Sequence, residues 1–469
     1  MGTAVRIATF ALMLTGVSWS VSAKELSGPA LMDRVTESRA FEAVVWGVPA
    51  VNYELMYQEM IRLGGKPNQI VYWSGLFDWR NQTLTPNPDV VYFIAFFNTK
   101  DGPIVIEIPP AEGGVINGSI MDPWQAALED VGPAGVDKGA GGKYLILPPG
   151  YSEPVPEGYV ALPSNNFQGY ALLRSIPKTG GKADVDAAVA YGKTIKLYPL
   201  SEAAHPSETV FLDALGKVYD STIPYGQRFF QSLDRFVQSE PWLDRDRAMI
   251  DQLKTIGIEK GKPFNPDQRM QTLLKSGAAE AHSWLDLQYE TTFPPYYLGR
   301  RWVFPISEEA VSGLQSQYAN PDSYSVDGRG VTYTMAFFST KHSGVGQFYL
   351  MTTKDKEGRT LAGAGTYRLK IPANPPVRQY WSVTAYDRKT HALIRNQKSA
   401  SRSSLSPDLK QNADGSVDIV FSAREPKEGV SNWIPTDPNG NFEALFRFYG
   451  PEKPVFDKTW MLPDIEKLK

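Results

Sequence analysis

A stiff polar loop that leads directly into an apolar strand constrains the fold of this chain more than any other stretch. The loop is Pro86-Asn87-Pro88-Asp89, and residues 90–97 after it are all apolar or aromatic. Each proline fixes one backbone torsion, so Asn87 is held from both sides. β-Branched and aromatic residues favour strands. The pattern therefore predicts a strand over residues 91–100 whose entrance presents an amide and a carboxylate in fixed positions.

Much of this strand recurs in the second half of the chain, at residues 332–341. When Tyr92 is aligned with Tyr333, further positions match: Ala95 with Ala336, Phe96 with Phe337, Phe97 with Phe338, Thr99 with Thr340, and Lys100 with Lys341. We therefore predict a second strand over residues 331–339 and a diverged internal duplication. Chance similarity between two aromatic strands is the alternative. The polar loop is not repeated, because Asp89 falls on Gly330 in this alignment.

The order of the predicted elements indicates an α+β fold that is mainly β. Short apolar segments separated by Gly and Pro predict antiparallel strands in both halves, and apolar residues at helical spacing lie between them. We expect two duplicated antiparallel β-sandwich modules, jelly-roll-like, with a helical insert and an N-terminal helical arm. The expected boundaries are a signal peptide at 1–23, the arm at 24–70, the first module at 71–183, the helical region at 184–325 and the second module at 326–469.

The first residues predict export. One positive charge, Arg6, precedes an apolar run over residues 7–21, and small residues end at Ala23. This is typical of a secretory signal peptide cleaved after Ala23; a buried N-terminal helix is the alternative. The run is too short and too interrupted for a membrane span, and no second candidate follows. With no cysteine in the chain, we expect a soluble periplasmic or secreted protein.

Composition excludes several classes of function. The net charge of −3 comes with no basic block, so we expect no nucleic-acid partner. The absence of cysteine excludes thiol nucleophiles and thiolate metal sites. The chain has no phosphate loop, zinc-protease motif or nucleophile elbow, so no nucleotide cofactor is expected and the cofactor is unknown. His282 and Asp286 could place two metal ligands on one helix face, but without a third ligand no metal site is predicted. His342 has no convergent partner in sequence.

Several ordered motifs resemble a bacterial exported family of two modules, the domains of unknown function twelve-fifty-four (N-terminal) and twelve-fourteen (C-terminal). Thr85 to Tyr92 is similar to the first module's Thr-Pro-Asn-Asn-Asp-Thr-Leu-Tyr, although Pro88 and Val90 replace an Asn and a Thr. The second module is matched by residues 380–384, 412–416, 432–436, 447–451 and 459–466. The resemblance implies β-sandwich modules of jelly-roll type joined by helices in a secreted or periplasmic protein. It supplies no reaction and no catalytic residues.

The polar loop is the first candidate site. We expect Asp89 to act as a general base or ligand anchor, with Asn87, Arg80 and Tyr92 as ligand-binding neighbours. The alternative is a loop whose Asn87 and Asp89 only cap backbone amides. Because the aligned segment of the second half lacks the loop, such a site would occur once per chain.

The second candidate site lies in the C-terminal half. His391 could act as a general acid or base, with Arg395 clamping an anionic group; a structural turn with a solvated His391 is the alternative. Asn432 and Trp433 could bind a sugar or apolar ligand, whereas a core tryptophan is the other interpretation of Trp433.

From these residues we predict a periplasmic enzyme that acts on a small organic or carbohydrate-like molecule in a cleft between the modules. Carboxylate and histidine acid–base catalysis would suit a hydrolase, lyase or isomerase. The alternative is a non-catalytic binding or assembly protein that recognises a glycan, lipid or protein partner. The N-terminal arm suggests a homo-oligomer under either hypothesis.

Overall fold

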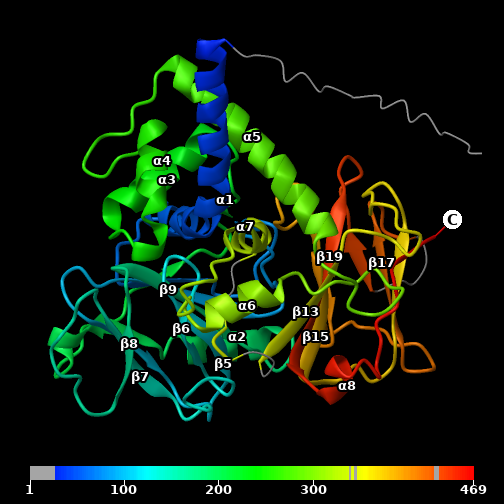
Figure 1. Cartoon of the computed structure of the whole chain (residues 1–469). Coiled ribbons are helices and arrows are strands. Elements are labelled where there is room, and N and C mark those ends of the chain that lie inside the picture. Colours follow the sequence, from blue (N-terminus) through cyan, green and yellow to red (C-terminus); the bar gives the residue numbers. More distant parts are fainter. Residues whose placement is uncertain (1–26, 337–339, 343–345, 427–431, 469) are drawn as a thin grey trace, which may run out of the picture.

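The chain forms two β-rich modules and a bundle of helices (Figure 1). The computed structural model describes residues 27–336, 340–342, 346–426 and 432–468. The predicted signal peptide lies outside the described residues. Among the helices that are described, none is long and apolar enough to cross a membrane.

The first β module consists of two sheets that face one hydrophobic cluster. Its six-stranded sheet has the order β11-β1-β3-β9-β5-β6: β11 (Phe211–Asp213), β1 (Gln69–Tyr72), β3 (Val91–Asn98), β9 (Gln168–Ser175), β5 (Ile116–Met121) and β6 (Ala127–Val131). Its four-stranded sheet has the order β10-β4-β7-β8: β10 (Lys196–Pro199), β4 (Ile104–Ile108), β7 (Gly142–Leu147) and β8 (Tyr159–Pro163). A short parallel pair, β2 (Asn81–Gln82) with β12 (Tyr219–Asp220), adjoins them.

The strand predicted after the polar loop is confirmed as β3, and it is buried on both faces. Phe93 and Phe97 point into the cluster between the two sheets, whereas Ile94 and Phe96 point into a second, larger cluster. Successive side chains of a strand lie on opposite faces. An all-apolar strand therefore has to be covered on both sides, and the helices supply the second cover.

The second β module repeats the arrangement of two sheets around one hydrophobic cluster. One sheet has the order β13-β19-β15-β16: β13 (Gln347–Thr352), β19 (Phe442–Pro451), β15 (Val377–Asp387) and β16 (Ser401–Ser403). The other has the order β18-β17-β14-β20: β18 (Trp433–Pro435), β17 (Val417–Ser422), β14 (Tyr367–Ile371) and β20 (Glu466–Lys467). Leu445 and Tyr449 of β19 point out of this module and into the same large cluster that covers β3.

The N-terminal helix is confirmed, but it lies at the centre of the molecule. The helices are α1 (Gly28–Arg62), α2 (Lys182–Gly192), α3 (Gln227–Ser239), α4 (Ala248–Thr255), α5 (Gln268–Thr291), α6 (Glu308–Gln315), α7 (Val326–Met335) and α8 (Lys453–Phe456). Residues 43–56 of α1 are buried without interruption, because α3, α5 and α7 pack around them. The expected helical region also contributes β10 and β11 to the first module.

The predicted strand at residues 331–339 is wrong for residues 331–335, which are the end of helix α7; residues 337–339 lie outside the described residues. The helix is favoured because it packs on α1 at close range. Pro49 cannot donate a hydrogen bond to the Val45 carbonyl, and a Cβ on Gly330 would lie 2.8 Å from that oxygen. Tyr333 therefore has no strand counterpart of Tyr92, and this alignment does not mark a duplicated strand.

The close contact between α1 and α5 gives a test of the packing. We expect Gly277→Ala to destabilise the fold by about 1–3 kcal/mol, since a Cβ there would lie 2.5 Å from the Glu37 carbonyl oxygen and 2.7 Å from Ala40 Cβ. The exposed neighbour Ser276→Ala is the control and should change stability by less than about 0.5 kcal/mol. Urea unfolding measures both, and equal stabilities of the two variants would contradict the prediction.

Candidate functional site

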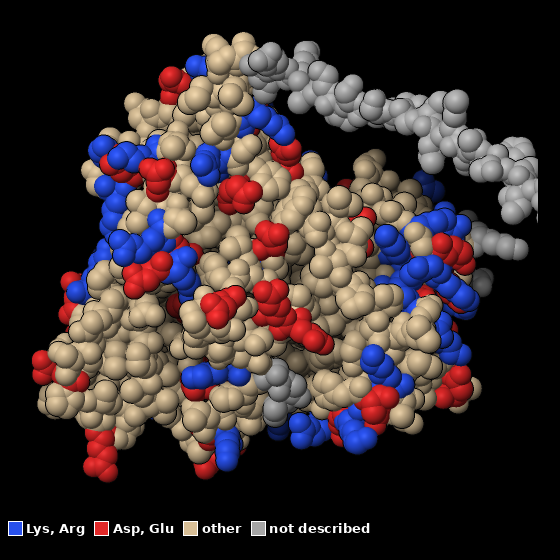
Figure 2. All heavy atoms as spheres, in the orientation of Figure 1, with Lys and Arg blue, Asp and Glu red and all other residues tan. Residues whose placement is uncertain are grey.

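A pocket of about 480 Å³ lies between the two β modules. Strands β5 and β6 form one wall, β13 forms the opposite wall, and α6 closes a side. Much of the lining is apolar, including Phe304, Val311 and Phe348. A pocket of this size and lining is typical of a site for a small organic molecule. Acidic side chains gather near α6 in the middle of this face, while Lys and Arg side chains lie toward its margins (Figure 2).

One wall of the pocket carries a histidine paired with a carboxylate. His342 Nε2 lies 2.8 Å from Glu129 Oε1, and Lys341 Nζ lies 3.2 Å from the other oxygen, Oε2. Glu129 is buried, whereas about half of the His342 side chain is exposed. The carboxylate therefore fixes the imidazole ring at the pocket wall, as it does in many acid–base sites.

The segment that carries His342 is held by Asp130. Its Oδ2 accepts hydrogen bonds from Thr340 Oγ1 at 3.0 Å and from the backbone nitrogens of Lys341 and His342 at 2.9 and 2.7 Å. Ser119 Oγ donates to its Oδ1 at 2.7 Å. The buried Asp130 carboxylate thus positions the histidine through the backbone.

Two small cavities lie on the interior side of the pocket, each of about 20 Å³, which is room for roughly one water molecule. Pro305 and Tyr349 border both the pocket and the first cavity. Thr85, Tyr92 and Arg174 border both cavities. A line of spaces therefore leads from the pocket to the polar loop at residues 85–89.

The inner end of this line is a buried group of side chains that we call the tyrosine–arginine centre: Tyr92, Arg174, Tyr380, Arg447 and Tyr449. Arg174 Nε donates to the Tyr92 hydroxyl at 3.2 Å. The rings of Tyr380 and Tyr449 are stacked with centroids 4.3 Å apart. All five side chains are buried, and they come from both modules, on β3, β9, β15 and β19.

Arg447 fastens the polar loop to the second module. Its Nη2 donates to the Thr85 carbonyl at 2.8 Å and to the Tyr386 hydroxyl, and its Nη1 donates to Thr384 Oγ1 at 2.9 Å. The Tyr386 hydroxyl in turn donates to the Pro86 carbonyl at 2.6 Å. The Thr85 and Pro86 carbonyls of the loop are therefore satisfied by side chains of the other module.

Asn87 reaches across the module boundary. Its Nδ2 lies 2.8 Å from the Tyr380 hydroxyl and 3.0 Å from the Tyr449 hydroxyl. Its Oδ1 accepts the backbone N–H of Asp89 at 3.1 Å, so the cap of the alternative interpretation is present as well. Its backbone N–H also donates to the Tyr92 hydroxyl at 3.1 Å.

Tyr449 is a buried tyrosine whose pKa is lowered. Burial raises its pKa, but the positive charges of Arg174 and Arg447 and the donated hydrogen bonds from Asn87 and Tyr380 bring the pKa below the ordinary value of tyrosine. Tyr380, as the donor of the pair, has a raised pKa, mainly because it is buried. A negative charge is thus stabilised on the Tyr449 oxygen.

Asp89 lies at the same boundary. Ser401 Oγ donates to its Oδ1 at 3.0 Å, and its Oδ2 has no hydrogen-bond partner among the described residues. Burial raises the pKa of Asp89, and the Ser401 hydroxyl only partly opposes this.

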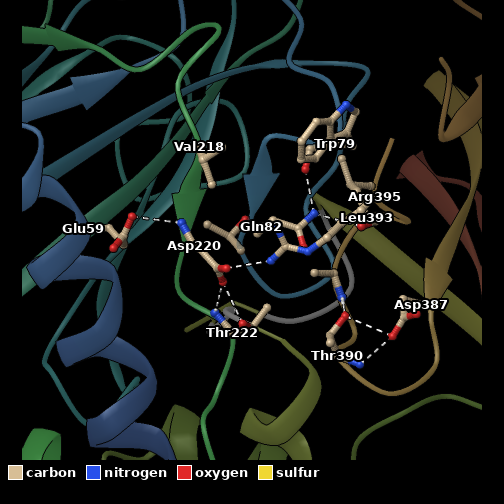
Figure 3. Close-up of polar contacts among 12 residues, drawn as sticks. Glu59, Trp79, Gln82, Val218, Asp220, Thr222, Asp387, Thr390, Leu393 and Arg395 are labelled. Carbon is tan, nitrogen blue, oxygen red and sulfur yellow. Dashed lines mark hydrogen bonds and ion pairs between the residues drawn. The ribbon is translucent and has the colours of Figure 1, made fainter. Parts of the chain in front are cut away.

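His391 and Arg395 have partners of their own. Buried His391 lies with Nδ1 2.9 Å from Glu443 Oε1, while half-exposed Arg395 bonds Asp220 across the module boundary at 2.6 Å (Figure 3). The His391 carbonyl accepts the N–H of Thr85 at 2.6 Å. No hydrogen bond or ion pair in the described part of the chain joins Asp89, His391 and Arg395 directly.

The other expected ligand-binding residues lie away from the pocket. Half-exposed Arg80 pairs with Asp78 and sits over the Trp79 ring. Asn432 Nδ2 donates to backbone carbonyls of Lys410 and Asp418, and Trp433 Nε1 donates to the Ser422 carbonyl at 3.0 Å.

His282 stacks on Tyr225 with ring centroids 3.9 Å apart and lies 3.8 Å from Asp286. Burial lowers its pKa. Over the described ranges, no group of three metal-binding side chains occurs.

Sequence reasoning missed most residues of this site, among them Glu129, Asp130, Arg174, His342, Tyr380, Arg447 and Tyr449. A weak signal existed for some of them. Arg447 and Tyr449 lie within the motif 447–451 that carried the family resemblance, and Arg174 ends an apolar strand. An arginine inside an apolar strand is unusual, because burying its charge is costly without partners.

The raised pKa of Asp89 predicts a pH effect on stability. An acid whose pKa is raised by folding stabilises the fold when protonated and loses that contribution as pH rises through the folded pKa. We therefore expect Asp89→Asn to gain melting temperature relative to the wild type at pH 7, and to gain less as the pH falls toward about 4, the usual pKa of aspartate. The exposed Asp251→Asn controls for loss of one surface charge. A difference that is the same at every pH would contradict the expectation.

The lowered pKa of Tyr449 predicts an optical signal. Titration of tyrosinate absorbance should contain a component that ionises below about pH 10, the ordinary tyrosine value. Tyr449→Phe should remove it. Tyr380→Phe should keep the component but move it to higher pH, because one donated hydrogen bond is lost. Identical titrations of wild type and Tyr449→Phe would refute the assignment.

Comparisons with known proteins agree with this architecture. None of the curated proteins matches the sequence. The VPA0106 protein from Vibrio parahaemolyticus is similar in structure, with 17% sequence identity, a TM-score of 0.56, and coverage of 92% of this chain and 100% of the Vibrio chain. At this identity the likeness shows a shared fold alone. An uncharacterized protein from Burkholderia cenocepacia has 11% identity, a TM-score of 0.43, and coverage of 93% and 94%.

Two families match the two β modules. Residues 67–199 match the family described as "Protein of unknown function (DUF1254)", and residues 346–453 match "Protein of unknown function (DUF1214)". The resemblance drawn from the sequence motifs is therefore confirmed for both domains. This chain carries a DUF1254 domain at its N-terminal side and a DUF1214 domain at its C-terminal side.

Proposed function

We propose that this protein is an enzyme that uses acid–base catalysis on a small, mainly apolar organic molecule bound between its two modules. The observation that carries the proposal is the 480 Å³ pocket with the His342–Glu129 pair at its wall. From the sequence we expected a histidine and a carboxylate, His391 and Asp89, as the catalytic groups. In this proposal the pair is instead His342 and Glu129.

Each polar residue of the wall has a role in this proposal. Glu129 orients the imidazole through Nε2, which leaves Nδ1 to accept or donate a proton. Asp130 fixes the backbone on which His342 stands. Asn117 Oδ1 and Gln347 Oε1 are buried, line the pocket and have no hydrogen-bond partner among the described residues, so they would accept hydrogen bonds from substrate hydroxyl or amine groups. Hydrolysis, elimination and isomerisation are the reactions that this set can support.

Non-catalytic ligand binding is the second candidate, and one observation favours it. Lys341 lies 3.2 Å from the same carboxylate that orients His342. A carboxylate shared with an ammonium group supports imidazolium less strongly. The pocket would then serve recognition alone.

We further propose that both modules are β-sandwiches of jelly-roll type and that the protein works in the periplasm. The shared hydrophobic cluster between the paired sheets of each module supports the first point. The signal-like residues 1–23 and the lack of cysteine support the second. A homo-oligomer also remains a proposal, although residues 43–56 of α1 are covered within the chain itself.

Variants of the pocket wall test the catalytic proposal. With a substrate found by metabolite screening, we expect His342→Asn to lower kcat by about 100-fold or more while the Kd for the substrate changes little. Ser312→Trp on α6 fills the pocket and should abolish binding, whereas the exposed Ser316→Trp near the end of that helix should not. Full turnover by His342→Asn would overturn the catalytic role, and a ligand recovered chemically unchanged would favour the binding protein.

A further inference from the structure

We infer that the molecule bound in this pocket is an organic carboxylate, whose apolar body fills the pocket and whose carboxylate is held by Arg174 and Arg447 at the inner end. The inference rests on the proposed pocket function and adds the class of ligand to it. It is carried by the tyrosine–arginine centre and by the two small cavities that lie between this centre and the pocket.

Arg174 is a buried cation, and only one of its guanidinium nitrogens, Nε, donates a hydrogen bond to a described residue. Its Nε binds the Tyr92 hydroxyl, but its two η nitrogens donate to no described residue, and its guanidinium borders both inner cavities. No carboxylate of the described chain forms an ion pair with it. Its side chain is 93% buried, since its exposed fraction is 7%. A buried guanidinium without a carboxylate is costly, so an anionic partner is expected at this place.

Arg447 adds a second positive charge beside the first inner cavity. Its hydrogen-bond partners are neutral oxygens of Thr85, Thr384 and Tyr386. Asp89 is the carboxylate whose field reaches Arg447, but burial raises the pKa of Asp89 and so weakens it as a counter-charge. Two cations therefore face at most one carboxylate.

The state of Tyr449 fits this charge balance. Without ligand, the excess positive charge favours ionisation of the Tyr449 phenol, as its lowered pKa indicates. A bound carboxylate would offset the same positive charges, so we expect ligand binding to raise the pKa of Tyr449.

Tyr349 separates the pocket from the centre. It lines both the pocket and the first inner cavity, and the Arg447 guanidinium lies 5.5 Å from its ring centroid. The cavity has room for about one water molecule. A carboxylate entering from the pocket would occupy this cavity and turn the Tyr349 ring aside. A free inorganic anion shares the charge but cannot use the apolar walls of the pocket.

Paired probes of the same shape test the inference on the full chain. Calorimetric titration compares 4-phenylbutyrate, its neutral amide and inorganic phosphate. We expect the carboxylate to bind at least about tenfold more tightly than the amide, because a paired guanidinium–carboxylate contact is worth more than a neutral hydrogen bond. Equal binding of carboxylate and amide, or no binding of the carboxylate, would overturn the inference without any variant. Phosphate binding as tight as the carboxylate would overturn the role of the apolar body.

Two variants assign the charge to Arg174. Arg174→Gln should remove the preference for the carboxylate, and Arg174→Lys, which keeps the charge, should retain part of it. A preference unchanged in Arg174→Gln would overturn the assignment. The pocket is tested separately: if Ser312→Trp blocks both organic probes while they bind the wild type equally, the pocket proposal stands and the carboxylate inference fails.

Discussion

The contact on which the structure depends is the burial of the loop at residues 85–89 against strands β15 and β19. Asn87 places one amide between two tyrosine hydroxyls, and Arg447 holds the Thr85 carbonyl. Buried polar groups are expensive to leave unpaired, and here their partners belong to the other module. The two modules are thus fixed to each other by hydrogen bonds as well as by the large hydrophobic cluster around α1.

This attachment creates the pocket and gives it its chemistry. Strands β5 and β6 face β13 only because the modules are held at this angle, and the pocket walls come from both. His342 lies outside strands β5 and β6, but Asp130 and Glu129 on β6 hold it at the pocket wall. The proposed site is therefore a product of module docking, and the deeper centre of arginines and tyrosines lies directly behind it.

The local pattern predicted the strand at β3, the N-terminal helix and two β-rich halves, because period-two and helical spacing are properties of short stretches. It failed at residues 331–335, whose β-branched residues and Tyr333 favour a strand but form the end of helix α7, packed on α1 and α5. The two prolines marked Asn87 as a rigidly held ligand-binding candidate, but they did not predict its contacts with Tyr380 and Tyr449 of the other module. His342 could not be identified from the sequence, because its partner Glu129 is far away along the chain.

The sequence alone determined many of the elements, the two domain families, and the rigidity of the Pro86-Asn87-Pro88-Asp89 loop, since proline acts on its own neighbours. Only the tertiary structure decided what that loop touches, and it placed Arg174 and Arg447 close enough to lower the pKa of Tyr449. It also gave His391 and Arg395 separate partners in Glu443 and Asp220. The reason is physical: charges and hydrogen bonds depend on distances in space, and only the packing of two sheets on one central helix sets those distances.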